Sequence, residues 1–178
     1  MKNNQELQTS KQYTKEEIRN AAIIMHPKSP AYNITLNDIS MLFEEWSNFT
    51  PLKSPIYDEY GNEFRDSEWY YMAARTKNVE IKKMISFLSI WHWLAKKSPN
   101  LFELDNNLDH KIMYMRNAIK KKFDTNPHLK EKLLQTWKLQ IIEYTYRWDI
   151  FFGINQKDLI WSNVLWKLLM EYRYSCKK

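Results

Sequence analysis

The sequence predicts a single, mainly helical domain of the α+β class, with a small β-hairpin and short strands. Three observations predict this class. The 178 residues suffice for one domain with a hydrophobic core. Several stretches carry apolar residues at helical spacing behind helix-capping signals. One turn-rich segment lies between two short extended runs, which is the pattern of a hairpin.

The N-terminal part is predicted to form an extension to this domain. Residues 1–42 are assigned to the extension, and residues 43–178 to the domain. Residues 1–13 are polar and are expected to be disordered. Thr14 and Glu17 have the spacing of a capping box, so short helices are expected after that segment, the first of them reaching about Met25.

The hairpin is predicted around the turn cluster at residues 58–62, between extended runs near Ile56 and Phe64. Asp66 and Ser67 are expected to cap the helix that follows. The remaining elements are predicted as helices at 68–77, 79–88 (with a continuation to 97 left open), 108–123, 127–137 and 162–174, a strand at 139–144 and a loop at 147–161.

Composition excludes several classes of protein. With only 2 glycines, the chain has no Gly-rich phosphate loop. The single Cys176 cannot form an internal disulfide, which suits a reducing compartment. The polar N-terminus has no signal core and no stretch can span a bilayer, so a cytoplasmic protein is expected, in a bacterium or in the host of a phage. The 4 histidines lack metal-ligand spacing, and no metal or cofactor is expected.

The net charge of +6 attracts phosphates, including those of nucleic acids and dinucleotides. The alternative is that the surplus lysines serve only solubility. Aromatic side chains are abundant, with 8 Trp, 11 Tyr and 8 Phe, and they either build the core or stack on planar ligands.

Several motifs occur in an order that resembles the NADAR, or YbiA-like, family. Ser47-Asn48-Phe49 resembles the family's opening Ser-Asn-Phe motif, and Ser67 to Arg75 resembles its Ser-Glu-His-Tyr-(aromatic)-Gln-Ala-x-Lys helix. Asp149 to Gly153 is similar to its Asp-x-x-Trp-Gly motif. Further similar segments are the hairpin 57–64, the helix 115–123, residues 133–143 and the closing helix 163–173. The resemblance covers about Phe43 to Tyr174.

The resemblance implies cleavage of an N-glycosidic bond to ribose. The function expected first is removal of ADP-ribose from modified guanine in DNA or nucleotides. This activity would reverse a DNA-modifying toxin, in an antitoxin or phage anti-defence role. Two alternatives stay open. One is a non-catalytic protein that binds ADP-ribose, nucleic acid or a toxin, and the other is a glycosidase of phosphorylated riboflavin-pathway intermediates. No membrane partner is expected.

Three residues are predicted to be catalytic: Glu68, Asp149 and Arg75. Such a reaction needs an ionised carboxylate near the anomeric carbon and an acid for the departing base. Glu68 is the first candidate, because it follows a helix cap and shares a helix face with Tyr71 and Arg75. Its alternative role is that of an ordinary first-turn residue. Asp149, in an aromatic loop, is the second candidate, with a turn-forming aspartate as the alternative.

The remaining candidates are predicted to bind the ligand. Asn48 and Asn163 are expected on ribose hydroxyls or a base edge, and Arg173 on a phosphate. Glu143 either orients other groups or forms a salt bridge. The other predicted ligand contacts are aromatic: Trp46, Phe49, Trp69, Tyr71 and Phe152. For each stacking aromatic, core packing is the alternative.

Two positions depart from the family pattern. Arg75 stands where the family helix has lysine, and arginine cannot form a Schiff base with an opened sugar because it stays protonated. Phe152 replaces the tryptophan of the Asp-x-x-Trp-Gly motif, which keeps stacking but loses an N–H donor. These changes indicate a divergent member with an altered substrate shape.

Overall fold

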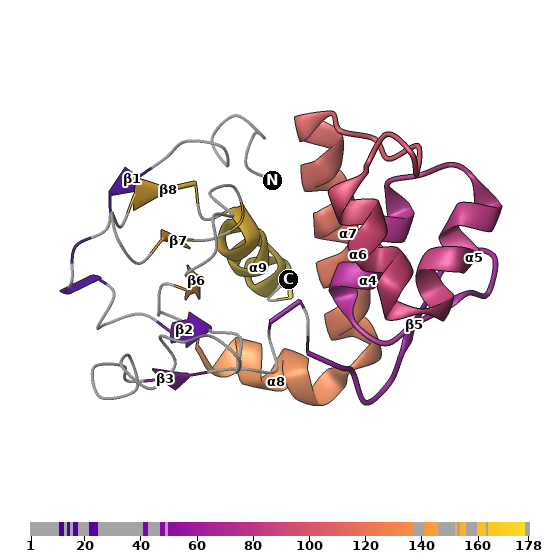
Figure 1. Cartoon of the computed structure of the whole chain (residues 1–178). Helices are drawn as coiled ribbons and strands as arrows, with labels where there is room; N and C mark the ends of the chain where they lie inside the picture. Colours follow the sequence, from indigo (N-terminus) through magenta and orange to yellow (C-terminus); the bar gives the residue numbers. More distant parts are fainter. Residues whose placement is uncertain are drawn as a thin grey trace. The chain divides into compact units, whose positions relative to one another are not determined.

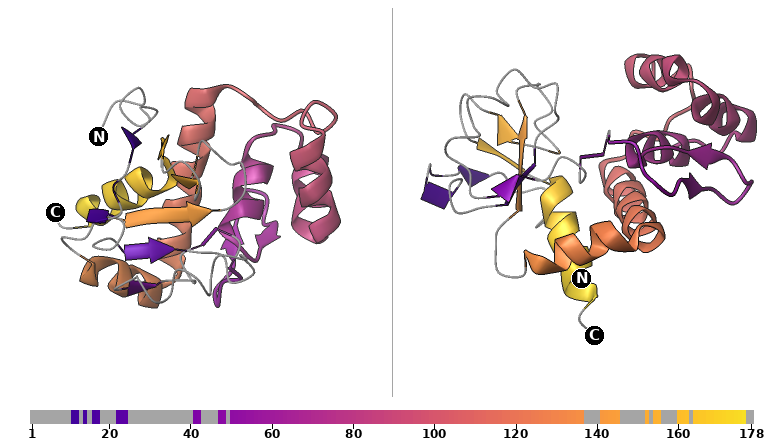
Figure 2. Two further views of the ribbon diagram at one scale, coloured as in Figure 1. Left: turned by 60° about the vertical axis from the view of Figure 1, so that its left-hand side comes forward. Right: turned by 90° about the horizontal axis from the view of Figure 1, so that it is seen from below.

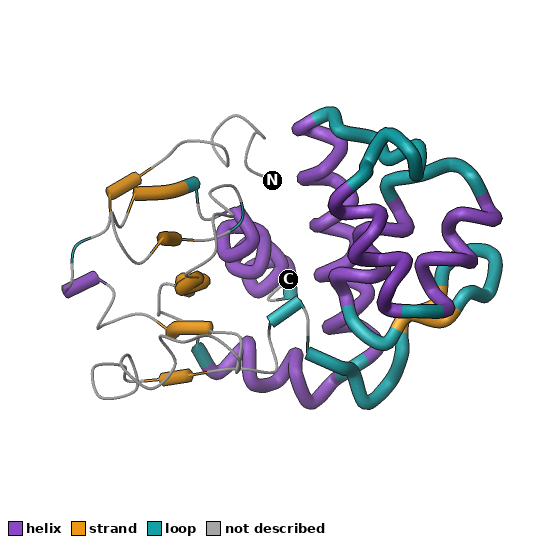
Figure 3. The backbone as a smooth tube through the Cα atoms, in the orientation of Figure 1, coloured by secondary structure: helices purple, strands orange, loops and turns teal. Residues whose placement is uncertain are grey.

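The computed structural model of the chain describes most of the middle of the sequence and selected parts of both ends (Figure 3). The described residues are 11–12, 14, 16–17, 22–24, 41–42, 47–48, 50–136, 141–145, 152, 154–155, 160–162 and 164–176. In most of the strands at the two ends of the chain, only the backbone is described.

The chain divides into two compact units (Figure 1). Residues 48–127 form the first, here called the central unit. Residues 1–47 and 128–178 form the second, here called the terminal unit because it combines both ends of the chain.

The central unit begins with the predicted hairpin. Strands β4 (Ile56–Tyr57) and β5 (Glu63–Phe64) pair antiparallel. The turn between them is held by the Asp58 carboxylate, which accepts hydrogen bonds from the backbone of Tyr60 and Asn62. Gly61 has φ +81°, a left-handed conformation that glycine adopts without steric cost.

Four helices complete the central unit: α4 (Ser67–Ala74), α5 (Val79–Phe87), α6 (Ser89–Lys97) and α7 (Leu108–Thr125). Helix α4 contacts the other three helices and both strands of the hairpin. The helix predicted at 108–123 is confirmed as α7, and its apolar residues Ile112, Met115 and Ile119 are fully buried. The option of one continuous helix from Val79 to Lys97 is wrong, because Leu88 is extended, with φ −135° and ψ 137°, and separates α5 from α6.

The terminal unit contains a parallel sheet with the strand order β3-β2-β6-β7. Its strands are β2 (Ala22–Ile24), β3 (Met41–Leu42), β6 (Ile141–Thr145) and β7 (Ile154–Asn155). Strands β2 and β6 run side by side in the same direction (Figure 2). A separate antiparallel pair joins β1 (Lys11–Gln12) to β8 (Ile160–Trp161).

Two helices belong to the terminal unit: α8 (Pro127–Gln135), apart from its first residue, and α9 (Val164–Ser175). Helix α9 packs on β6 and buries its apolar face completely, including Trp166. The predicted bounds of both helices agree with the structure to within two residues.

The predicted fold class, mainly helical with a small hairpin and short strands, is confirmed. Three local predictions in residues 1–42 can be compared with the structure, of which one is confirmed and two are wrong. Thr14 and Glu17 form the predicted capping box, with each backbone N–H donating to the other side chain. However, Ala22–Ile24 is a strand and not the end of that helix, because its backbone pairs with β3 and β6. Lys11–Gln12, expected to be disordered, pairs with β8. The boundary at residue 43 stays a prediction.

Two further findings concern the absence of features. No helix in the described residues is long and apolar enough to cross a membrane. Within the same residues, no group of three or more His, Cys, Asp or Glu side chains is placed to hold a metal ion.

Candidate active site

The start of helix α4 is held in place by side chains. The Asp66 carboxylate caps the helix and accepts a hydrogen bond from the Trp69 backbone N–H at 2.9 Å. The Asn48 carbonyl accepts a bond from the Glu68 N–H at 3.1 Å, and its side-chain oxygen accepts one from the Ser67 hydroxyl at 3.0 Å. These contacts satisfy donors that a helix start leaves without helical partners, so the position of Glu68 is fixed.

The Glu68 carboxylate is buried, with 5% of the residue exposed. Its Oε1 lies 3.3 Å from the Lys96 ammonium and 4.0 Å from Nε2 of His92, both on helix α6. Burial acts to raise the Glu68 pKa, but the charge of Lys96 and the contacts with His92 outweigh it and lower the pKa to about 2. Glu68 is therefore ionised at neutral pH despite its burial.

Asp66 lies in a contrasting environment two residues before Glu68. Burial raises its pKa to about 6, and the negative charge of Glu68 adds to this effect. The Trp69 N–H and the charges of His92 and Lys122 act in the opposite direction but do not cancel it. The pair thus combines one carboxylate that stays charged well into the acid range with one that takes up a proton as the pH falls through about 6, a division of roles that acid–base chemistry uses.

Aromatic rings surround this pair. The half-buried Trp69 ring stacks on His92, with 5.9 Å between ring centroids and an angle of 23° between planes. His92 itself is 1% exposed and makes an edge contact with Trp93. The Lys96 side chain is 39% exposed, so an anionic group from solvent can reach its ammonium beside Glu68.

Arg75 lies at the C-terminal end of α4 and makes a different set of contacts. Its Nε donates to the Asp105 carbonyl at 3.0 Å, and one terminal nitrogen donates to the Asn106 side chain at 2.6 Å. The other terminal nitrogen contacts Met72 Sδ at 3.5 Å, and the guanidinium carbon lies 5.4 Å from the centre of the Tyr71 ring. Of the face predicted for Glu68, Tyr71 and Arg75, the contact between Arg75 and Tyr71 is present, whereas Glu68 meets residues of helix α6. The guanidinium fastens the segment before α7.

The other predicted site residues fall into two groups. Asn48 and Tyr71 are buried in the central unit, where the Asn48 amide nitrogen donates to Met115 Sδ at 3.3 Å. Arg173 is 1% exposed in the terminal unit, and one of its nitrogens donates to the carbonyl and the hydroxyl of Thr136, each at 2.8 Å. The catalytic or ligand-binding roles of these residues stay predictions.

The second group has little or no described structure. The Phe152 carbonyl accepts a bond from the Leu165 N–H, and Glu143 belongs to strand β6 with only its backbone described. The predicted residues outside the described part of the chain are Trp46, Phe49, Asp149 and Asn163.

Three residues of the Glu68 cluster were not predicted as site residues: Asp66, His92 and Lys96. Asp66 was interpreted only as a helix cap, and His92 only as one of the 4 histidines without metal-ligand spacing. A spacing of four residues places His92 and Lys96 on one face of a helix. That spacing was the available signal, but it does not say which carboxylate the face will meet.

Among solved structures, the chain is similar to the NMR structure of the E. coli protein YbiA. The TM-score is 0.63, the sequence identity is 23%, and the match covers 89% of this chain and 86% of that chain. The chain has a YbiA-like fold. No protein-family model matches the sequence, and no curated protein matches it. The YbiA-like fold agrees with the fold that the motif resemblance implied.

Proposed function

We propose that this protein is an N-glycosidase of the NADAR type, which removes ADP-ribose from modified guanine in DNA or nucleotides. The observation that carries the proposal is the buried Glu68 carboxylate, held in its ionised form by Lys96 and His92 at the start of α4. The YbiA-like fold is the second support.

The proposed reaction breaks the bond between the anomeric carbon of ADP-ribose and a guanine nitrogen. The bonding electrons move to the nitrogen, which takes a proton from an acid. A water molecule adds to the anomeric carbon and releases a proton. Positive charge develops on the sugar as the bond breaks, and a fixed carboxylate such as Glu68 stabilises that charge.

The neighbours of Glu68 fit the rest of such a substrate. The half-exposed Lys96 ammonium can bind a phosphate of ADP-ribose, and the net charge of +6 favours an anionic substrate. Asp66, with a pKa of about 6, has the proton affinity that a general acid needs near neutral pH. Asp149 stays the acid predicted from the sequence.

The test is release of ADP-ribose from ADP-ribosylated DNA by the purified protein. Glu68→Gln keeps the size of the side chain but removes its charge, and should lower the rate by about 10²–10³-fold. Glu80→Gln is the matched control, because Glu80 is an exposed first-turn glutamate of helix α5. It should leave the rate unchanged. Absence of release under conditions where a NADAR enzyme is active would refute the proposal.

A non-catalytic ADP-ribose, nucleic-acid or toxin-binding protein is the second candidate, and Arg75 favours it. Arginine at position 75 has no amine that could form a Schiff base with an opened sugar. Each nitrogen of its guanidinium already contacts Asp105, Asn106 or Met72. The second candidate predicts that ADP-ribose binds without turnover and with an affinity that Glu68→Gln does not change. Appearance of activity in Arg75→Lys would show that the missing amine is what prevents catalysis.

A further inference from the structure

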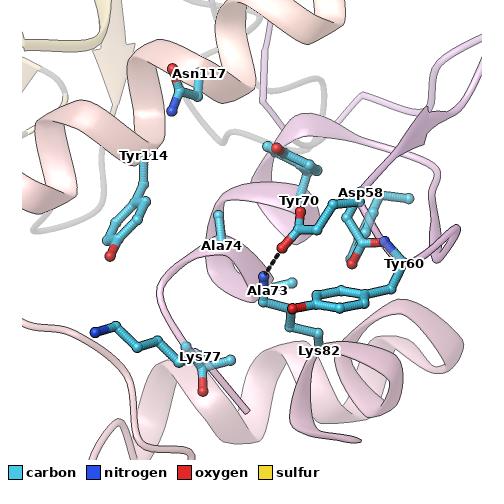
Figure 4. Close-up of a pocket in the computed structure, with 12 residues that line it drawn as sticks. Asp58, Tyr60, Tyr70, Ala73, Ala74, Lys77, Lys82, Tyr114 and Asn117 are labelled. Atoms are coloured by element: carbon cyan, nitrogen blue, oxygen red, sulfur yellow. Dashed lines mark hydrogen bonds and ion pairs between the residues drawn. The ribbon is translucent and has the colours of Figure 1, made fainter. Parts of the chain in front are cut away.

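A pocket of about 500 Å³ lies in the central unit, between the hairpin turn and helices α4, α5 and α7 (Figure 4). Helix α4 contributes Tyr70, Ala73 and Ala74 to it, whereas Glu68 and Arg75 do not line it. The pocket is therefore separate from the Glu68 cluster. Its volume is in the range of about 300–1,000 Å³ that is common for small-molecule sites.

The acidic side chains of the pocket are already paired. One Asp58 oxygen accepts from the backbone N–H groups of Tyr60 and Asn62, and the other accepts from the Asn62 side chain at 2.8 Å. Glu59 forms an ion pair with Lys82 at 2.6 Å, and the Lys82 ammonium also lies 5.2 Å from the Tyr60 ring centre. This end of the pocket is closed by internal contacts.

The opposite end presents polar groups with unused donors. Lys77 and Asn117 are exposed, and Figure 4 shows both away from Tyr60 and Lys82, with Tyr114 lying between them. Within the described part of the chain, no hydrogen bond or ion pair involves the Lys77 ammonium or the Asn117 amide. The Tyr114 hydroxyl donates to Asp105 at 3.2 Å, so its ring is held in place. Among the described residues, the Lys77 ammonium at this end has no acidic partner, whereas the Asp58 carboxylate at the other end keeps its negative charge and is hydrogen-bonded by neutral groups.

The middle of the pocket suits a flat apolar group. The methyl side chains of Ala73 and Ala74 leave space between the rings of Tyr70 and Tyr114. Phe64 lies behind this surface and is fully buried. Tyrosine rings on either side of two small apolar side chains favour a ligand with a planar ring, because stacked or edge contacts between aromatic rings are favourable.

We propose that this pocket is a second ligand site, which binds a mononucleotide-sized anion with its aromatic base over Ala73 and Ala74. The phosphate lies at Lys77, which supplies a charged donor. The pocket uses none of the residues of the proposed glycosidase site, so the proposal does not rest on that function.

The test measures binding of AMP to the full chain by calorimetry, with adenosine and inorganic phosphate as partial probes. AMP should bind, and each partial probe should bind more weakly. Lys77→Ala should weaken AMP binding by about tenfold or more, since one charge-assisted contact is lost. Lys97→Ala is the matched control, because Lys97 is an exposed lysine of the same unit that does not line the pocket. It should leave the affinity unchanged.

Two further variants decide where AMP binds. Ala74→Leu fills the pocket and should abolish binding, and circular dichroism checks that this variant folds. Glu68→Gln should leave AMP binding unchanged. The proposal is overturned if AMP does not bind, if adenosine binds as tightly as AMP, or if Lys77→Ala leaves the affinity unchanged. A loss of binding in Glu68→Gln would also overturn it, because AMP would then occupy the Glu68 cluster.

Discussion

Replacing Asp66 by asparagine should change how the stability of the protein depends on pH. Asp66 is 7% exposed, and burial raises its pKa from the ordinary 3.8 to about 6. Asparagine keeps an oxygen that can accept the hydrogen bond from the Trp69 N–H, so the helix cap survives. The substitution therefore removes the buried charge but keeps the local structure.

The direction of the effect follows from the raised pKa. The folded state binds the Asp66 proton more tightly than the unfolded state. The resulting stabilisation is complete below about pH 3.8 and is lost as the pH rises through about 6. One pKa unit corresponds to about 1.4 kcal/mol, so the total loss is about 3 kcal/mol. Asp66→Asn does not titrate and should gain about 3 kcal/mol relative to the wild type over this interval.

Urea unfolding of both proteins at several pH values between about 4 and 7 measures the difference in the free energy of unfolding. Asp109→Asn is the control, because Asp109 is an exposed aspartate in the first turn of α7. Titrating groups that do not interact with Asp66 affect the wild type and the variant equally and cancel in the difference. A difference between wild type and Asp66→Asn that does not change with pH would refute the reasoning.

Two other substitutions test the central unit. Asn126 is fully buried, and its side chain donates to the Ser54 carbonyl and accepts from the Ser54 N–H. Asn126→Ala should therefore lower the free energy of unfolding, measured in urea, by about 1–3 kcal/mol. A decrease below about 0.5 kcal/mol would contradict this. Gly61→Ala should lower the free energy of unfolding by about 1 kcal/mol. A Cβ at this position meets no atom within 4 Å, so only the left-handed backbone conformation disfavours alanine. A much larger loss in the same assay would show that the turn has further constraints.

Much of the central unit could be predicted from the sequence because its signals are local. The turn cluster at residues 58–62 predicted the hairpin, and Asp66 was correctly predicted to cap α4. Asn126 and Pro127 predicted the start of α8, which begins at Pro127. Each of these signals acts through hydrogen bonds or backbone preferences within a few residues, so the rest of the fold is not needed to interpret it.

The strands near the N-terminus could not be predicted in the same way. Ala22–Ile24 becomes a strand because it pairs with β6, which lies more than a hundred residues later in the chain. Parallel pairing between such distant segments leaves no local turn signal, and short apolar runs suit a helix and a strand equally. The break at Leu88 has no glycine or proline to announce it.

The sequence by itself determined the class of fold, the order of most helices and the place of Glu68 as a carboxylate at a helix start. Only the tertiary structure decided the electrostatic state of that carboxylate. Helix α6 brings Lys96 and His92 to Glu68, and these contacts lower its pKa, while burial raises the pKa of Asp66 two residues away. A pKa depends on which charges and how much solvent surround a group in space, and this information is absent from local sequence patterns.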